Sequence, residues 1–187
     1  MPDFAKSMIN RYPNSLLQPG ATAPEFHFRV DTNNPLNTDE RSLAHLRSET
    51  EVVVLIFFKA ECPTCKLAFP FLERIYRRIK NQGNFGAFLA IAQNSPTDAR
   101  EFFARFGATF PRTTEDEPFE ISNLYGVTNV PSILLVDRDG TIRTSIVGFS
   151  REALDKLSRE ITEALGENHE GSLFDEADRS VPTMQPG

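Results

Sequence analysis

The chain has 187 residues, of which 40% are hydrophobic and 25% are charged, and its net charge is −6. These values are typical of one globular domain with a substantial core, and the lack of a basic stripe in the sequence argues against a nucleic-acid partner. No stretch approaches the roughly 20 apolar residues of a membrane span. Residues 1–8 carry neither the basic nor the apolar segment of a secretion signal. We therefore expect a cytoplasmic protein, or a periplasmic one if a native leader has been removed.

Composition divides the chain into three parts. Residues 1–22 are expected to form an N-terminal arm, in which a weakly amphipathic segment meets Pro13, Pro19 and a glycine. Residues 23–166 carry the patterns of strands and helices and are expected to form one domain. Residues 167–187 are rich in Gly, Asp, Glu, Ser and Pro, which predicts a polar and flexible tail.

The first half of the domain predicts strands that lead to one long helix. Residues 23–30 alternate apolar and polar side chains, as in a half-buried strand, and residues 31–35 have the composition of a turn. A short helical turn over residues 42–46 precedes a continuous apolar run over residues 52–58, which is typical of a buried strand. Helical periodicity then predicts a helix from about residue 63 to 81.

The middle of the domain predicts a second strand and helix. Residues 85–92 form another apolar run, and Ser95 has the side chain of a helix cap before Pro96. The helix should end at Gly107. Residues 109–120 are acidic and predict a solvated loop.

The last part of the domain predicts an antiparallel pair and a final helix. After a helical turn over residues 121–125, a strand is expected up to residue 137, with Pro131 near its start. A hairpin turn then leads to a strand over residues 141–147, and an amphipathic helix follows from about residue 150 to Gly166. This order predicts an α/β fold with a mixed central β-sheet flanked by helices on both faces.

Two cysteines, Cys62 and Cys65, are the only ones in the chain, and they lie where the buried strand gives way to the long helix. The unpaired N–H groups of a first helical turn stabilise a thiolate. Pro63 suits the first helical position, where its missing donor costs nothing. The second sulfur lies about one turn away and can attack a mixed disulfide formed at the first. The spacing therefore predicts a dithiol–disulfide couple.

Other uses of two cysteines agree less well with the sequence. A zinc site would need two further ligands, and the three histidines are scattered along the chain. A structural disulfide that closes so short a loop would add little stability. Charges at Lys59, Glu61 and Lys66 argue against two inert thiols in an apolar setting. We therefore expect no metal and no cofactor.

The arrangement resembles the thioredoxin fold, and specifically the TlpA-like redoxins among the thiol–disulfide oxidoreductases. The resemblance spans about residues 20–165 and rests on four stretches: residues 20–26, 57–70, 125–131 and 136–140. It implies a cis Val130–Pro131 bond that faces the Cys62 sulfur. It also implies that Cys62 attacks and Cys65 resolves, and that Asn129, Val130 and Pro131 bind an extended substrate as an added strand. The implied partners are protein or small-molecule disulfides and thiols, and a redox partner that the sequence does not identify.

Several positions depart from this family's pattern. Ile56 stands where thioredoxins have a buried Asp, and Ala68 stands where related reductases have a Glu. Both usual proton acceptors for Cys65 are therefore missing. Glu61 replaces the tryptophan that usually precedes the first cysteine.

Four residues around the dithiol are expected to modulate it: Lys59, Glu61, Pro63 and Thr64. A positive charge at Lys59 favours a nearby thiolate, whereas a negative charge at Glu61 disfavours it. Pro63 and Thr64 separate the two cysteines. Because these influences oppose one another, either direction of electron flow agrees with the sequence.

Two other functions share the fold. A peroxiredoxin-like thiol peroxidase would need a proline and a hydroxyl residue where this chain has Leu55 and Lys59. A non-catalytic peptide-binding module would use the groove beside Pro131, and the two intact cysteines argue against it.

Overall fold

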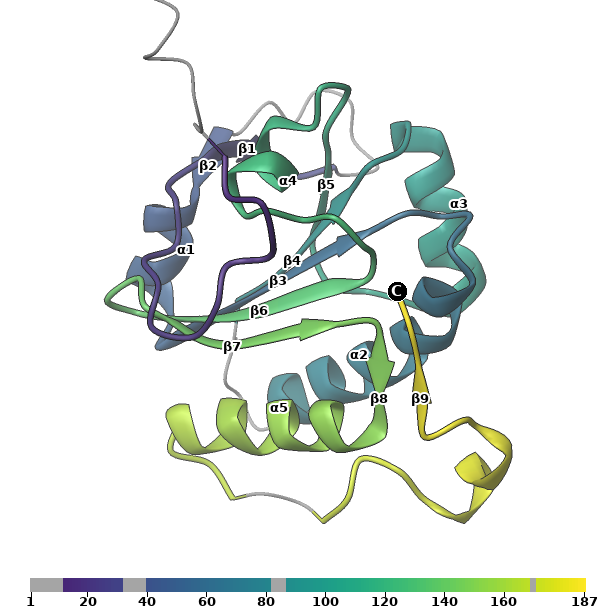
Figure 1. Cartoon of the computed structure of the whole chain (residues 1–187). Helices are drawn as coiled ribbons and strands as arrows, with labels where there is room; N and C mark the ends of the chain where they lie inside the picture. The colour runs from purple at the N-terminus through teal and green to yellow at the C-terminus, as the bar shows by residue number, and fades with distance from the viewer. Residues whose placement is uncertain (1–11, 32–39, 82–86, 169–170) are drawn as a thin grey trace, which may run out of the picture.

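A five-stranded mixed sheet forms the centre of the protein (Figure 1). The computed structural model describes residues 12–31, 40–81, 87–168 and 171–187. The strand order is β5-β4-β3-β6-β7. The strands, in chain order, are β3 (Val52–Phe58), β4 (Ala87–Ala92), β5 (Arg112–Thr114), β6 (Ser132–Asp137) and β7 (Ile142–Val147). The pairs β3–β4 and β4–β5 are parallel, and the pairs β3–β6 and β6–β7 are antiparallel.

The central strand β3 is buried along its whole length, as its continuous apolar run predicts. Its side chains alternate between two hydrophobic clusters. Val54, Ile56 and Phe58 point to one side, and Leu55 and Phe57 point to the other. Both faces of the sheet are therefore covered, and the predicted mixed sheet with helices on both faces is confirmed.

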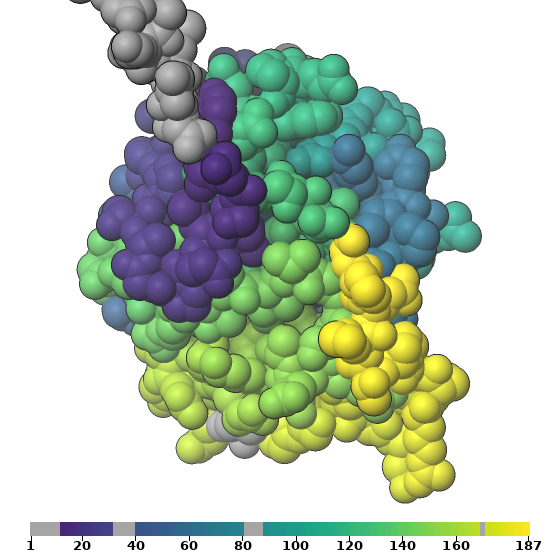
Figure 2. All heavy atoms as spheres, viewed as in Figure 1, coloured from purple at the N-terminus to yellow at the C-terminus, as the bar shows by residue number. Residues whose placement is uncertain are grey.

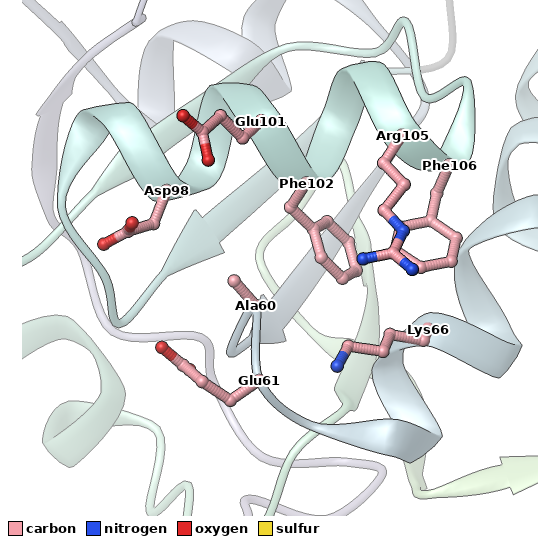
Figure 3. Close-up of a pocket in the computed structure, with 8 residues that line it drawn as sticks. All are labelled: Ala60, Glu61, Lys66, Asp98, Glu101, Phe102, Arg105 and Phe106. Carbon is pink, nitrogen blue, oxygen red and sulfur yellow. The ribbon is translucent and has the colours of Figure 1, made fainter.

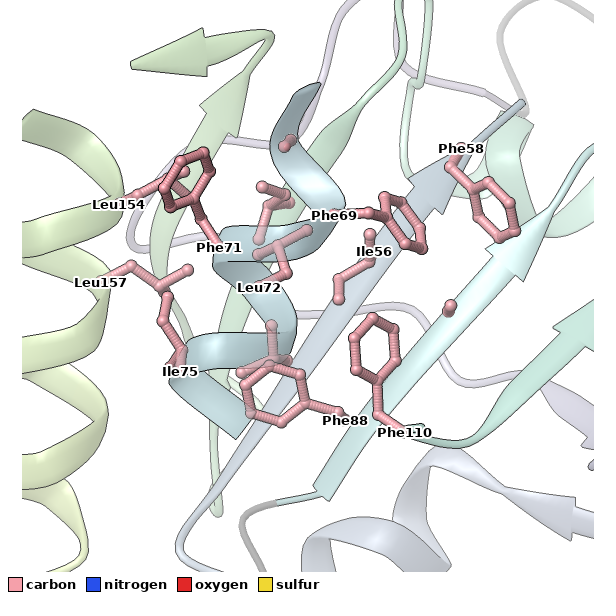
Figure 4. Packing of buried hydrophobic residues seen from close by; sticks show 14 of the residues in the cluster. Ile56, Phe58, Phe69, Phe71, Leu72, Ile75, Phe88, Phe110, Leu154 and Leu157 are labelled. Carbon is pink, nitrogen blue, oxygen red and sulfur yellow. The ribbon is translucent and has the colours of Figure 1, made fainter. Parts of the chain in front are cut away.

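One face is covered by α2 (Pro63–Asn81), α3 (Pro96–Phe106) and α5 (Arg151–Ala164). The core under these helices is rich in phenylalanine, as 16 Phe and no Trp in the sequence lead us to expect (Figure 4). The rings of Phe58 and Phe69 lie 4.7 Å apart between the sheet and α2. This packing fixes the start of α2 relative to the end of β3.

The other face is covered by α1 (Leu43–Glu49) and α4 (Glu120–Leu124). A small antiparallel pair, β1 (His27–Arg29) and β2 (Glu40–Ser42), adds to this layer. The fully buried ring of Tyr125 fills the space beside α4.

The ends of the helices follow the local signals of the sequence. Ser95 accepts a hydrogen bond from the Asp98 backbone N–H at the start of α3, and Gly107 ends that helix in the left-handed region with φ of 66°. Ser150 caps α5 in the same way as Ser95 caps α3.

Some expected elements differ in length or lie outside the described residues. The strand expected over residues 23–30 contains only the three residues of β1, and the expected helical turn over residues 42–46 extends into α1. Several expected features lie wholly or mostly outside the described part of the chain. They are the N-terminal amphipathic segment, the turn at 31–35 and the first two residues of the strand at 85–92.

The prediction of a solvated loop over residues 109–120 is wrong in two places. Residues 112–114 form β5, an edge strand parallel to β4. Glu115 is 9% exposed and accepts hydrogen bonds from the backbone N–H groups of Ile121 and Ser122 at the start of α4 and from the Ser122 hydroxyl. A carboxylate at this place satisfies donors that a helix start leaves unpaired. Burial raises the pKa of Glu115.

The tail has more regular structure than its polar composition suggests. Residues 176–180 form a 3-10 helix, η2 (Glu176–Ser180), and β9 (Met184–Gln185) pairs antiparallel with β8 (Phe149–Ser150). Figure 1 shows β9 beside β8, and Figure 2 shows the last residues (yellow) on the surface between green and blue segments of the chain. The tail has this structure because charged side chains of α2 and α5 form hydrogen bonds with its backbone. Leu173 of the tail is also buried.

Candidate active site

Cys62 and Cys65 lie at the start of α2, directly after the loop that follows β3. Both are thiols. Cys62 is half-buried, whereas Cys65 is completely buried. The structure therefore presents one sulfur toward the surface and keeps the second inside the protein.

Two backbone groups contact the Cys62 sulfur. The Cys65 N–H donates to Cys62 Sγ at 3.3 Å, and the Cys62 thiol donates to the Val130 carbonyl oxygen at 3.2 Å. The first contact stabilises a thiolate at Cys62, because an N–H group directed at a sulfur favours negative charge there. The second contact favours the thiol. The sulfur is thus placed between a donor and an acceptor.

Burial raises the pKa of the Cys65 thiol far above its usual range. The nearby Cys62 acts in the same direction, whereas a backbone hydrogen bond from Lys59 opposes it. Ile56 and Ala68, which replace the family's acids, are both completely buried. Cys65 is therefore protonated at neutral pH, with an apolar side chain at each position where a relative carries a proton acceptor.

The loop before β6 lies beside the cysteines, although 68 residues separate Cys62 from Val130. The Val130–Pro131 peptide bond is cis, as the resemblance implies. Asn129 is exposed and Val130 is half-buried, but Pro131 is buried. The Ser132 hydroxyl donates to the Asn129 carbonyl at 2.7 Å and so fixes the loop.

Asn94 holds the loop that leads to Cys62, a role that was not among the predictions. Its Oδ1 accepts a hydrogen bond from the Ala60 N–H at 2.8 Å, and its Nδ2 donates to the Glu61 carboxylate at 2.9 and 3.1 Å. Asn94 follows β4, which is parallel to β3, so both strands end at the same edge of the sheet. That pairing is the only signal by which Asn94 could have been found.

The two charged residues expected to modulate the dithiol have partners of their own. Glu61 is exposed and is bound by Asn94. The Lys59 amine lies 5.5 Å from the centre of the Phe119 ring, which is a cation–π contact. Pro63 is exposed at the first position of α2.

Thr64 is only 4% exposed, because the tail covers it. Its hydroxyl donates to the Pro186 carbonyl at 2.6 Å and accepts from the Gln185 side-chain amide at 2.9 Å. Nothing near Thr64 in the sequence indicates this contact, since more than 120 residues separate the partners.

A cavity of about 310 Å³ lies beside the active-site loop (Figure 3). Figure 3 shows Lys66 and Arg105 on one side of it and Glu61 and Asp98 on the other. The residues that line it are Ala60, Glu61, Lys66, Asp98, Glu101, Phe102, Arg105 and Phe106. Neither cysteine is among them.

Within the described ranges, no three His, Cys, Asp or Glu side chains lie together in a way that would hold a metal ion. In the same part of the chain, every helix is too short or too polar to cross a membrane.

Known proteins resemble this chain over about half of its length or more. The Redoxin family model matches residues 18–166. The thiol-disulfide oxidoreductase ResA of Geobacillus kaustophilus is 32% identical over 139 residues, which cover 73% of this chain and 74% of that protein. Human nucleoredoxin is 28% identical over 92 residues, which cover 48% of this chain and 21% of that protein.

Solved structures show the same similarity. A crystal structure from Chlorobium tepidum, described as a thiol:disulfide interchange protein DsbE, is 26% identical with a TM-score of 0.66, and the match covers 80% of this chain and 99% of that chain. The thioredoxin domain of a Bacteroides vulgatus thiol-disulfide oxidoreductase has a TM-score of 0.64 at 17% identity, over 78% of this chain and 99% of that chain. At this identity the second likeness concerns the fold alone, and it confirms the predicted thioredoxin-like fold.

Proposed function

Because the chain belongs to the redoxin family and is a thiol–disulfide oxidoreductase, we propose that it exchanges disulfides with extended protein segments through Cys62 and Cys65. The observation that carries the proposal is the asymmetry of the two thiols. Cys62 is half-buried at the start of a helix with an N–H group directed at its sulfur, and Cys65 is buried one turn behind it.

The first step is attack by the Cys62 thiolate on one sulfur of a substrate disulfide. The substrate S–S bond breaks, a mixed disulfide with Cys62 forms, and one substrate thiolate leaves. The Cys65 N–H at 3.3 Å supports this role, because it stabilises the thiolate before attack. Pro63 has no backbone N–H, so it adds no unpaired donor at the helix start beside the Cys65 N–H.

The second step is attack by Cys65 on the Cys62 sulfur. Cys65 loses its proton, the intermolecular S–S bond breaks, and the second substrate thiolate leaves. The substrate has then gained two electrons, and the protein holds a Cys62–Cys65 disulfide. The reverse sequence forms a disulfide in the substrate. Because burial raises the pKa of Cys65, we expect this resolving step to be the slower one.

The groove for the substrate is proposed to lie between the start of α2 and residues 129–131. The Val130 carbonyl accepts from the Cys62 thiol, so a segment that pairs with this loop would bring its disulfide to the attacking sulfur. Asn129 offers an exposed side chain beside it, and Thr64 offers a hydroxyl on the opposite wall. Lys59, Glu61, Pro63 and Thr64 are proposed to modulate the couple.

The test is to trap the mixed disulfide. Cys65→Ser is incubated with a disulfide-bonded peptide, and the product is identified by mass after digestion. We expect the peptide to be joined to Cys62, and we expect Cys62→Ser to form no adduct. An adduct at neither position, or consumption of hydrogen peroxide much faster than disulfide exchange, would contradict the proposal. Equilibration with glutathione buffers gives the direction: a potential near about −270 mV marks a reductant, and one near about −120 mV marks an oxidant.

A further inference from the structure

The last residues of the tail lie along the proposed groove. In β9, Gln185 pairs with Phe149 and Met184 pairs with Ser150, and the Arg151 N–H donates to the Thr183 carbonyl at 2.9 Å. The tail thus approaches the site as a strand added to β8 (Figure 1). This is the way in which extended peptides commonly bind to a free strand edge.

Residues 185–187 then contact both walls of the groove. The Thr64 hydroxyl donates to the Pro186 carbonyl at 2.6 Å and accepts from the Gln185 side chain at 2.9 Å. On the other wall, the Asn129 side-chain amide donates to the Gly187 backbone oxygen at 3.2 Å. The two walls therefore bind the tail mainly through its backbone oxygens.

The backbone of the tail lies very close to the cis-proline loop. A Cβ atom built on Gly187 would lie 3.0 Å from the Val130 carbonyl oxygen, which also accepts from the Cys62 thiol. A Cβ atom on Gly148 would lie 2.7 Å from the Gln185 carbonyl oxygen and 2.8 Å from the Gly187 nitrogen. Two glycines thus permit this approach, and Gly187 lies against the oxygen that accepts from the Cys62 thiol.

Contacts upstream hold the tail against the domain. Asp178 accepts from the Arg74 guanidinium at 2.7 Å, and these hydrogen bonds lower the pKa of that carboxyl. Arg151 donates to the Asp178 and Val181 carbonyls, and Leu173 is only 1% exposed. Residues 167–187 lie beyond the stretch that the Redoxin family model matches. The contact is therefore a feature of this chain in addition to the family domain.

We propose that residues 185–187 are an internal ligand of the peptide groove, and that a protein substrate must displace them to reach Cys62. The inference rests on the proposed function, because it gives the proposed groove an occupant. It also defines the substrate class: an extended segment with a small residue opposite Val130 and a hydrogen-bonding side chain opposite Thr64. Cys62 itself stays half-exposed, so small disulfides still reach it.

The consequence is selective competition. When the tail occupies the groove, an extended substrate binds only to the molecules in which the groove is open. Its apparent affinity is therefore the intrinsic affinity multiplied by the open fraction. Because the tail is part of the same chain, its effective concentration is about millimolar, so it competes without being tightly bound. A small disulfide that needs no groove is unaffected.

The experiment uses the full chain with Gln185→Ala and Gly187→Val combined. The first change removes the hydrogen bond to Thr64, and the second places a Cβ atom only 3.0 Å from the Val130 carbonyl oxygen and 3.2 Å from the Gly148 nitrogen. The matched control is Met184→Ala, whose side chain is 70% exposed. We expect the KM for a disulfide-bonded extended peptide to fall at least about threefold in the double variant. The rate with 2-hydroxyethyl disulfide should change less than about twofold, and the control should behave as the wild type.

A second measurement adds the free peptide Thr-Met-Gln-Pro-Gly to the double variant. We expect it to raise the KM for the peptide disulfide again, whereas a scrambled peptide should not. An unchanged or higher KM in the double variant would overturn the inference, as would a lack of competition by the free peptide.

The two proposals fail in different ways. If no variant exchanges any disulfide, including the small one, the proposed function falls. Binding of the free peptide to the double variant, followed by NMR shifts at Thr64 and Asn129, needs no exchange and still tests the occupant. An absence of such shifts would overturn the internal ligand whatever the activity.

Discussion

The two cysteines at the first turn of α2 differ in exposure and in hydrogen bonding, although they are close in sequence. At one end, Cys62 is half-exposed and lies between the Cys65 N–H and the Val130 carbonyl. At the other end, Cys65 is completely buried beside Ala68, and burial raises its pKa. The start of α2 thus places one sulfur within reach of solutes and one inside the protein, as the proposed exchange mechanism requires. Position on the helix decides the chemistry of each thiol.

The largest expected effect of this difference is in alkylation. In the reduced native protein, we expect iodoacetamide to modify Cys62 at least about a hundredfold faster than Cys65, because only Cys62 is both accessible and supported as a thiolate. Digestion and mass analysis after timed quenching give the two rates. In concentrated urea, the rates should become similar. Comparable rates in the native protein would break the comparison.

The pH dependence of resolution tests the buried end. In the proposed mechanism Cys65 must ionise before it attacks, and its pKa is raised by burial, so below that pKa its thiolate fraction grows with pH. We expect the release of the second substrate thiol to speed up about tenfold per pH unit between roughly pH 6 and 8. Stopped-flow detection of the two thiol-release phases separates the steps, and Cys65→Ser should lack the second phase. A flat profile would show that a group of the protein takes the proton.

The sequence predicted the parts of the site that depend on local patterns. The buried run at 52–58, the proline at the start of α2 and the capping serines Ser95 and Ser150 each specify structure through near neighbours. The position of the two cysteines follows from the first two of these. The cis Val130–Pro131 bond came from the resemblance, since residue patterns alone do not distinguish it.

What escaped prediction depends on contacts between distant segments. Arg112–Thr114 is too short to be read as a strand and is stabilised by pairing with β4. Asn94 gains its role only because parallel strands end together. The tail is polar, and many of its partners are charged or backbone groups. Its composition therefore resembles that of a flexible segment, although distant groups bind it. A sequence pattern covers only a short stretch of the chain, whereas these contacts join stretches that lie far apart in the sequence.

Asn94 allows a smaller test of the exposed end. Asn94→Ala leaves the Ala60 N–H without its partner and frees Glu61. We expect the attack step at Cys62 to slow about three- to tenfold, with a loss of about 1 kcal/mol in the free energy of unfolding. Single-turnover kinetics and urea denaturation give the two values. Asn94→Asp keeps an acceptor for Ala60 but repels Glu61, so it should retain stability better than Asn94→Ala. Equal attack rates in all three proteins would remove Asn94 from the site.

The smallest expected effect concerns Glu115, where burial acts on a carboxyl as it acts on the Cys65 thiol. Its pKa is raised in the folded protein, mainly by desolvation, while hydrogen bonds from Ser122 and Ile121 oppose the shift. A raised folded-state pKa means that the folded protein binds the proton more tightly than the unfolded chain. The stabilising contribution of the protonated form is therefore complete below the unfolded pKa and is lost as pH rises through the folded one.

Glu115→Gln should remove this contribution to the pH dependence, because its amide keeps an oxygen acceptor for the start of α4 without a charge. Relative to the wild type, the variant should thus be more favourable at pH 7 than at pH 4 in urea unfolding. Glu101→Gln, at an exposed position of α3 and not among the groups that act on the pKa of Glu115, is the matched control for loss of a single charge. If both variants followed the same pH profile, the effect would be one of net charge. Burial would then act on the thiol alone, and the parallel between Glu115 and Cys65 would fail.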